Sequence, residues 1–219
     1  MISVAPLLCD SRPLNVLCLG AHADDIEIGC GGTLLTLLSG GRPVSVRWVV
    51  FSGDEHRARE ARASAAAFLE NAIDPIIELH DFTDGFFPSE TGSIKAVFEQ
   101  IKRGVQPDII LTHTLNDSHQ DHAVIAQMTG STFRNHLVMG YEIAKYDGDL
   151  GRPDTYIHLS ETMARDKADK ICQSFPTQAC RSWFNPETFL SLARLRGIEC
   201  NAPQGFAEAF YARKMVLSL

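Results

Sequence analysis

Apolar runs and longer mixed segments alternate along the first 135 residues of the chain. Four short runs are typical of strands buried in a sheet, and they cover residues 14–19, 44–51, 75–79 and 108–112. The segments between them favour helices, at residues 30–40, 56–70, 93–104 and 119–130. Strands that alternate with helices form a parallel sheet covered on both faces. The expected fold is a Rossmann-like α/β domain with three layers, α/β/α, and a mostly parallel sheet.

The pattern is looser after residue 135. Two more strands are predicted at residues 138–143 and 155–159, and two more helices at residues 160–174 and 186–196. Ser160 is the expected cap of the first of these helices, and Asp117 or Ser118 that of the helix at residues 119–130. The last segment, residues 206–217, fits a strand or a helix. No repeat or linker interrupts the chain, so residues 1–219 are expected to form one domain.

Composition and charge narrow the function. The 219 residues are 45% hydrophobic and 21% charged, which is ordinary for a soluble protein. A net charge of −7 without a basic cluster argues against nucleic acid as a partner. The six cysteines form no CxxC pair and fit reduced thiols in the cytoplasm. No signal peptide or membrane-spanning segment is visible.

Two clusters of imidazoles and carboxylates follow predicted strands. His22, Asp24 and Asp25 lie on the turn after the first strand, and a second group follows the strand at 108–112: His113, Asp117, His119, Asp121 and His122. Ligands of open α/β sheets bind at the carboxyl ends of the strands. If these two strands are neighbours, their loops meet. His113 and Asp117 are expected to be solvated loop residues or helix caps rather than supports for such a site.

The spacing within each cluster suits a metal ion. His22 and Asp25 are three residues apart on one turn, and His119 and His122 share one face of a helix. A catalytic zinc ion takes three protein ligands of this kind and keeps a position for water. Asp24 is left over beside the metal, where a carboxylate can accept a proton from water. The sequence thus favours a metal site of two histidines and one carboxylate.

These motifs resemble those of the LmbE-like, or PIG-L, zinc-dependent deacetylases. The Ala-His-Pro-Asp-Asp motif of that family corresponds to Ala21-His22-Ala23-Asp24-Asp25, followed by a glycine-rich helix start at Gly29-Cys30-Gly31-Gly32-Thr33. Its His-x-Asp-His motif corresponds to His119-Gln120-Asp121-His122. Weaker similarity continues in Arg57-Ala58-Arg59-Glu60-Ala61, in Arg196-Gly197 and in Ala207-Glu208-Ala209-Phe210. Ala23 replaces the usual proline, a change that neither adds nor removes a ligand.

The resemblance implies a role for each matching residue. One Zn²⁺ per chain would be held by His22, Asp25 and His122. Asp24 would be the general base, and His119 would stabilise the oxyanion or protonate the leaving amine. Asp121 would orient His119, and Arg57 would contact the substrate.

The activity implied by the resemblance is hydrolysis of an N-acetyl amide on a glucosamine-containing sugar conjugate, with release of acetate and a free amine. The partner is then a small molecule, and the resemblance also suggests a homo-oligomer. The sequence names neither the acceptor nor the physiological metal, because iron and cobalt accept the same ligands.

Two other functions and two local features stay open. Gly29, Gly31 and Gly32 could cradle the phosphate of a nucleotide in an oxidoreductase, although the pattern is not GxGxxG and two aspartates would repel phosphate. A metal-binding protein without turnover is the other alternative. Residues 145–152 form either a specificity loop or a surface turn. The aromatic side chains that belong either to the core or to a sugar site are Phe82, Phe86, Phe87, Tyr146, Trp183 and Phe184.

Overall fold

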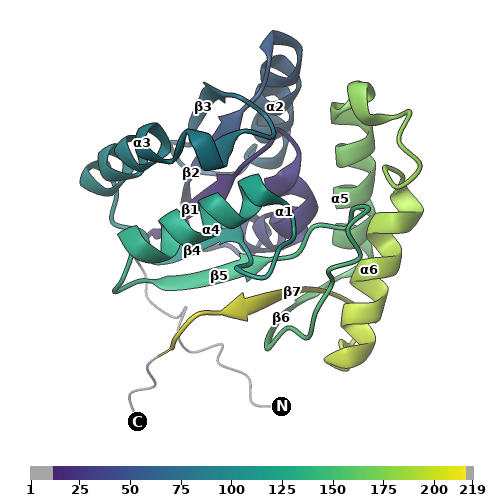
Figure 1. The fold of residues 1–219 in the computed structure, drawn as a ribbon. Helices are drawn as coiled ribbons and strands as arrows, with labels where there is room; N and C mark the ends of the chain where they lie inside the picture. The colour runs from purple at the N-terminus through teal and green to yellow at the C-terminus, as the bar shows by residue number, and fades with distance from the viewer. Residues whose placement is uncertain (1–11, 216–219) are drawn as a thin grey trace.

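Seven strands form one sheet in the computed structural model, which describes residues 12–215. The order is β3-β2-β1-β4-β5-β7-β6 (Figure 1). The strands are β1 (Leu14–Gly20), β2 (Val44–Ser52), β3 (Ile76–Phe82), β4 (Ile109–His113), β5 (Leu137–Tyr141), β6 (Thr155–Leu159) and β7 (Phe206–Ala212). Strands β3, β2, β1, β4 and β5 are parallel, and β7 pairs antiparallel with both β5 and β6. The mostly parallel sheet is therefore confirmed.

Helices cover both faces of this sheet (Figure 1). They are α1 (Asp25–Ser39), α2 (Glu55–Phe68), α3 (Thr91–Gly104), α4 (Gln120–Thr132), α5 (Glu161–Ser174) and α6 (Pro186–Glu199), with the 3-10 turns η2 (Phe87–Ser89) and η3 (Pro176–Gln178). Alternate residues of β1 point to opposite faces, as a strand requires. Leu17 joins the core under α3 and α4, whereas Val16 joins the core that includes α1, α2 and α5. The three layers expected from the sequence are present.

Strands β1 and β4 are direct neighbours, with Val16 opposite Ile109. Their carboxyl ends therefore deliver the two polar clusters to the same edge of the sheet. The predicted segment at residues 206–217 is a strand from Phe206 to Ala212, and its last residues, like Cys9, lie outside the described part. Among residues 12–215, no helix combines the length and the apolar character needed to cross a bilayer.

Helix α1 begins at Asp25, earlier than the predicted start at residue 30. The sequence placed Asp25 on the turn after the first strand, whereas the helix already begins there, and its glycines allow close packing. A Cβ atom at Gly29 would lie 2.1 Å from the ring of Tyr141, and one at Gly31 would lie 2.7 Å from the ring of Phe68. Most other element ends differ from the prediction by one to three residues, because hydrogen bonding decides them rather than hydrophobicity.

A buried ion pair binds the middle of α1 from the side. Glu208 of β7 accepts the backbone N–H groups of Gly32 at 2.8 Å and Thr33 at 2.7 Å. Lys167 of α5 donates to the carbonyl of Ile28 at 2.7 Å and to Glu208 at 2.6 Å. Both charged side chains are about 95% buried. The pair joins α1, α5 and β7. Glu208 also occupies the two N–H groups that a phosphate bound at these glycines would need.

Candidate active site

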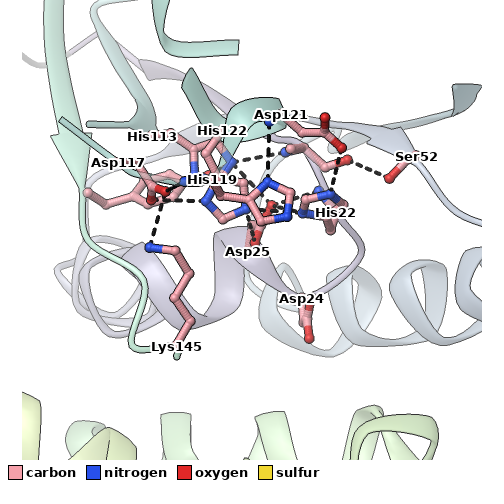
Figure 2. Close-up of polar contacts among 12 residues, drawn as sticks. His22, Asp24, Asp25, Ser52, His113, Asp117, His119, Asp121, His122 and Lys145 are labelled. Carbon is pink, nitrogen blue, oxygen red and sulfur yellow. Dashed lines mark hydrogen bonds and ion pairs between the residues drawn. The ribbon is translucent and has the colours of Figure 1, made fainter. Parts of the chain in front are cut away.

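The two polar clusters meet above the start of α1 (Figure 2). His22 comes from the loop that joins β1 to α1, Asp25 from the first position of α1, and His119 and His122 from the start of α4. Asp25 stands at the first position of α1, where the partial positive charge of a helix N-terminus favours a carboxylate. The adjacency of β1 and β4 thus assembles one site from residues about 100 positions apart.

Three donor side chains converge at the centre of the site. The Nδ1 atom of His22 lies 3.0 Å from Nε2 of His122 and 3.3 Å from Oδ2 of Asp25. The Nε2 atom of His122 lies 3.4 Å from Oδ1 of Asp25. Two imidazole nitrogens and a carboxylate are a donor set that zinc accepts. The side chains of His22, Asp25 and His122 all line the same pocket.

The opposite ring nitrogens of both histidines face carboxylates. Nδ1 of His122 lies 2.9 Å from Asp117. Nε2 of His22 lies 3.1 Å from Asp84 and 3.2 Å from Asp121. A carboxylate that accepts one N–H of an imidazole leaves the lone pair of the other nitrogen free for a metal. These contacts leave Nδ1 of His22 and Nε2 of His122 facing Asp25, where a bound metal would take their lone pairs.

The surrounding acids make the centre suitable for a cation. Burial alone would lower the pKa of His122, but Asp25 and Asp117 outweigh it and raise that pKa to about 9. Burial would raise the pKa of Asp25, yet the imidazoles of His122, His113 and His22 hold it well below its usual range. Without a metal, the raised pKa values of His22 and His122 therefore draw protons to this point. A divalent cation supplies the same positive charge.

Asp24 lies beside this centre and points away from it (Figure 2). Its Oδ1 accepts a hydrogen bond of 3.0 Å from Nη2 of Arg57 on α2, and both residues line the pocket. Burial raises the pKa of Asp24, although Arg57 opposes the shift. Arg57 also donates to Thr177 at 3.2 Å. Arg57, the residue expected to contact the substrate, therefore lines the pocket and is also the ionic partner of Asp24.

His119 caps α4, where Asp117 or Ser118 was expected as the cap. Its Nδ1 accepts the backbone N–H of Asp121 at 3.2 Å, which leaves the proton of a neutral ring on Nε2. Burial and the neighbouring imidazoles lower the pKa of His119. At neutral pH this side chain is therefore a neutral hydrogen-bond donor at the pocket wall.

The carboxylate of Asp121 does not make the contact that its implied role, the orientation of His119, would require. It accepts backbone N–H groups from Gly85 at 2.6 Å and Phe87 at 3.1 Å, and it contacts His22 rather than His119. Only the backbone amide of Asp121 reaches His119. The reason is the direction of the first turn of α4, which sends this side chain toward the loop after β3. Asp121 therefore orients His22 and that loop.

The expectation that His113 and Asp117 are solvated or mere caps is wrong. Both are more than 90% buried. The Nε2 atom of His113 lies 3.1 Å from Asp25, and its ring stacks on His122 with centroids 3.9 Å apart. Asp25, His113 and His122 can also gather around one ion, but His113 lines neither of the pockets at the site.

Sequence reasoning did not select Asp84 or Lys145 as part of the site. Asp84 lies on the loop after β3, and nothing in its spacing marks it as a partner of His22. Lys145 lies 3.1 Å from Oδ1 of Asp117, on the side away from His122 (Figure 2). Its place in the polar segment at residues 145–152 was the only signal. Because Lys145, Tyr146 and Asp147 line the pocket, the specificity-loop interpretation of that segment gains support.

The pocket has a volume of about 420 Å³, within the range that holds a small organic ligand. A neighbouring pocket of about 400 Å³ shares His22, Arg57 and Asp84 with it. Of the aromatic candidates, Tyr146 and Trp183 line the first pocket and Phe82 lines the second. Phe87 and Phe184 belong to the buried core, and Phe86 is exposed.

Comparison with solved structures shows the same fold in several proteins. The conserved protein TT1542 from Thermus thermophilus gives a TM-score of 0.71 at 16% identity, over 94% of this chain and 97% of that one. GalB, the 4-carboxy-2-hydroxymuconate hydratase of Pseudomonas putida, gives 0.69 at 18% identity, over 94% and 98%. The N,N'-diacetylchitobiose deacetylase of Pyrococcus horikoshii gives 0.65 at 19% identity, over 95% and 88%. Because the sequence identities are this low, these matches establish a common fold only.

Family membership comes from the sequence itself. No curated protein matched the chain. Residues 17–133, which hold both metal motifs, match the family PIG-L, described as GlcNAc-PI de-N-acetylase. This match covers more than half of the chain. The chain therefore belongs to the PIG-L (LmbE-like) family and is a hydrolytic enzyme of the N-deacetylase class.

Proposed function

We propose that this protein is a zinc-dependent deacetylase that hydrolyses the N-acetyl amide of a glucosamine-containing sugar conjugate. The observation that carries the proposal is the position of Asp24, a buried carboxylate beside a convergent His–Asp–His donor set at the wall of an open pocket. A purely structural zinc site is usually closed by four protein ligands. A buried carboxylate that faces a pocket from outside the donor set is instead suited to proton transfer.

His22, Asp25 and His122 would hold one zinc ion per chain. Their donor atoms converge, and carboxylates secure the outer nitrogens of both imidazoles. When bound, zinc supplies Lewis-acid chemistry, which polarises a carbonyl oxygen and acidifies water. His22, His119 and His122 form another possible donor set, so the choice of ligands can be tested directly.

Asp24 moves the proton during hydrolysis. It accepts one proton from the attacking water while a C–O bond forms at the acetyl carbonyl carbon. It then returns that proton to the amide nitrogen as the C–N bond breaks, so that acetate and a free amine result. The raised pKa of Asp24 suits both steps, because a base acts best when its pKa approaches the working pH. Arg57 holds the carboxylate in place.

His119 stabilises the carbonyl oxygen. Since its ring is neutral and protonated at Nε2, it can donate a hydrogen bond to the oxygen as negative charge develops there. A neutral imidazole is a poor source of a proton for the amine. The structure therefore favours the oxyanion role over the leaving-group role.

The two alternative functions have less support. The glycines of α1 pack against Tyr141, Phe68 and Leu159, and Glu208 takes the N–H groups of Gly32 and Thr33, so no phosphate cradle exists there. A metal-binding protein without turnover does not require the Asp24–Arg57 pair beside a pocket.

The test measures acetate release from a panel of N-acetylglucosamine conjugates, together with metal content by elemental analysis. We expect about one zinc per chain and acetate release that a chelator abolishes and added zinc restores. Acetate release that persists after complete metal removal would contradict the metal-dependent mechanism. Zinc binding without acetate release from any conjugate would favour the metal-binding alternative.

A further inference from the structure

Arg181 is a cation of the pocket that lacks an acidic partner within the described residues. The other two cations of the pocket are neutralised, Arg57 by Asp24 and Lys145 by Asp117 and Asp149. The Nε atom of Arg181 donates to Gln178 at 2.8 Å, which leaves both Nη groups for other acceptors. A guanidinium in this state presents a planar pair of donors that matches a carboxylate or phosphate.

The segment that carries Arg181 is held in place on both sides. The backbone N–H of Arg181 donates to Gln178 at 2.9 Å, and its carbonyl accepts the N–H of Phe184 at 3.1 Å. Phe184 is 5% exposed and packs edge-on against Phe189 with centroids 5.5 Å apart. The backbone at Arg181 is therefore fixed, and the exposed side chain is anchored to Gln178 through Nε.

Two aromatic rings complete this side of the pocket. Tyr146 is 68% exposed, and its ring meets that of Trp183 edge-on with centroids 6.3 Å apart. Exposed aromatic faces that line a pocket are suited to stacking on a ligand ring. Tyr146, Trp183 and Arg181 are called here the Arg181 wall, and they line the same pocket as Asp24 and His119.

We propose that the Arg181 wall selects N-acetylated amino sugars that carry an anionic group, a phosphate or a carboxylate. The sugar ring lies against Tyr146 and Trp183, the anion binds the Nη groups of Arg181, and the acetamide reaches Asp24 and His119. This inference rests on the proposed deacetylase function, and it adds a substrate class to it. Two more acids line the pocket: Asp147 lies 3.8 Å from Lys145, which Asp117 and Asp149 already neutralise, and Asp84 lies 3.1 Å from His22. Both oppose an anion, so the preference depends on its direct contact with Arg181.

The test compares kcat/KM for acetate release from N-acetylglucosamine, N-acetylglucosamine 6-phosphate and N-acetylmuramic acid. A charge-assisted contact to Arg181 is expected to favour an anionic sugar by about 10-fold to 100-fold, chiefly through KM. The two anionic sugars distinguish a phosphate from a carboxylate. Arg181→Gln should bring the ratio of anionic to neutral sugar close to one.

Arg165→Gln is the matched control. Arg165 lies on α5 and is 58% exposed in its side chain, so this variant removes the same charge away from the pocket. It should leave the ratio unchanged. Tyr146→Leu should weaken all three sugars by about threefold to tenfold, because stacking does not depend on the anion.

Equal kcat/KM for neutral and anionic sugars, or a preference that survives Arg181→Gln, would overturn the proposal. If none of the three sugars is deacetylated, the proposed function fails for these substrates, and calorimetry on the same sugars still tests the Arg181 wall. Tighter binding of an anionic sugar that Arg181→Gln removes would then support the wall alone. Equal binding of all three sugars would contradict it.

Discussion

The Nδ1 atom of His122 lies 2.9 Å from Oδ2 of Asp117, and this contact decides which nitrogen of His122 faces the pocket. Oδ1 of the same carboxylate lies 3.1 Å from Lys145, so Asp117 links the loop after β5 to the histidine. Asp117 itself does not line this pocket. Its contact with Nδ1 leaves Nε2 of His122 to face a bound cation.

Asp117→Asn should weaken zinc binding by about 10-fold to 100-fold, because partners of ligating histidines have effects of that size. The measurement is competition with a chelator of known zinc affinity. Asp169→Asn, at an exposed position of α5, is the control. An unchanged zinc affinity in Asp117→Asn would show that His122 does not depend on this contact or is not a ligand.

Asp24→Asn should keep its zinc and lose activity by about 10²-fold to 10⁴-fold, because an amide accepts no proton. The variant keeps the size of the side chain beside Arg57. Elemental analysis and kcat on the best conjugate provide the two readouts. Turnover close to that of the unmodified protein would refute Asp24 as the base, whereas loss of zinc would indicate that Asp24 is a ligand.

His119→Gln distinguishes two roles that the geometry allows for His119: donation to the oxyanion and binding of the metal. His22, His119 and His122 have nitrogens that lie within 4.8 Å of one another. If His119 donates to the oxyanion, kcat should fall by about 10²-fold to 10³-fold while zinc content and KM change little. A protein that instead loses its zinc would assign His119 to the metal.

Glu208→Gln should destabilise the fold by about 3–5 kcal/mol, because it leaves the Lys167 ammonium buried without its counter-ion. Urea unfolding of the single variants and of Lys167→Met/Glu208→Gln measures the effect. The double variant should cost less than the sum of the single variants, since it removes both charges. Additive costs would show that the two side chains act independently.

Glu78→Gln should remove a pH-dependent part of the stability. A hydrogen bond from His80 and the guanidinium of Arg47 lower the pKa of Glu78 to about 2. The folded-state pKa lies below the unfolded value of about 4.3, so the contribution is complete above that pH and is lost as the pH falls toward 2. Glu78 is 25% exposed in its side chain. With allowance for solvent screening, the contribution is about 1–2 kcal/mol.

The check on Glu78 is urea unfolding at pH 6, 4 and 3. The stability difference between the unmodified protein and Glu78→Gln should shrink across this range. Glu70→Gln, at an exposed position, should not show such a change. A difference that stays constant with pH would place the effect of Glu78 in packing rather than in charge.

Local patterns predicted most of the secondary structure correctly. Strand β6 matches its predicted range, and Ser160 caps α5 by accepting the N–H of Met163, as its position indicated. Helix α1 begins at Asp25 rather than at the predicted residue 30, so that Gly29 also belongs to the helix. In the structure, the rings of Tyr141 and Phe68 occupy the space that Cβ atoms would fill.

The sequence by itself determined the alternation of strands and helices and the two motifs that hold the polar residues, because both are written in residues close together in the chain. Only the tertiary structure decided that β7 is a strand, that His113 is buried against Asp25, and that Asp121 contacts His22. It also decided that Arg181 shares a pocket with Asp24. These facts depend on which elements pack together, and residues distant in the chain leave no mark of that packing in a local pattern.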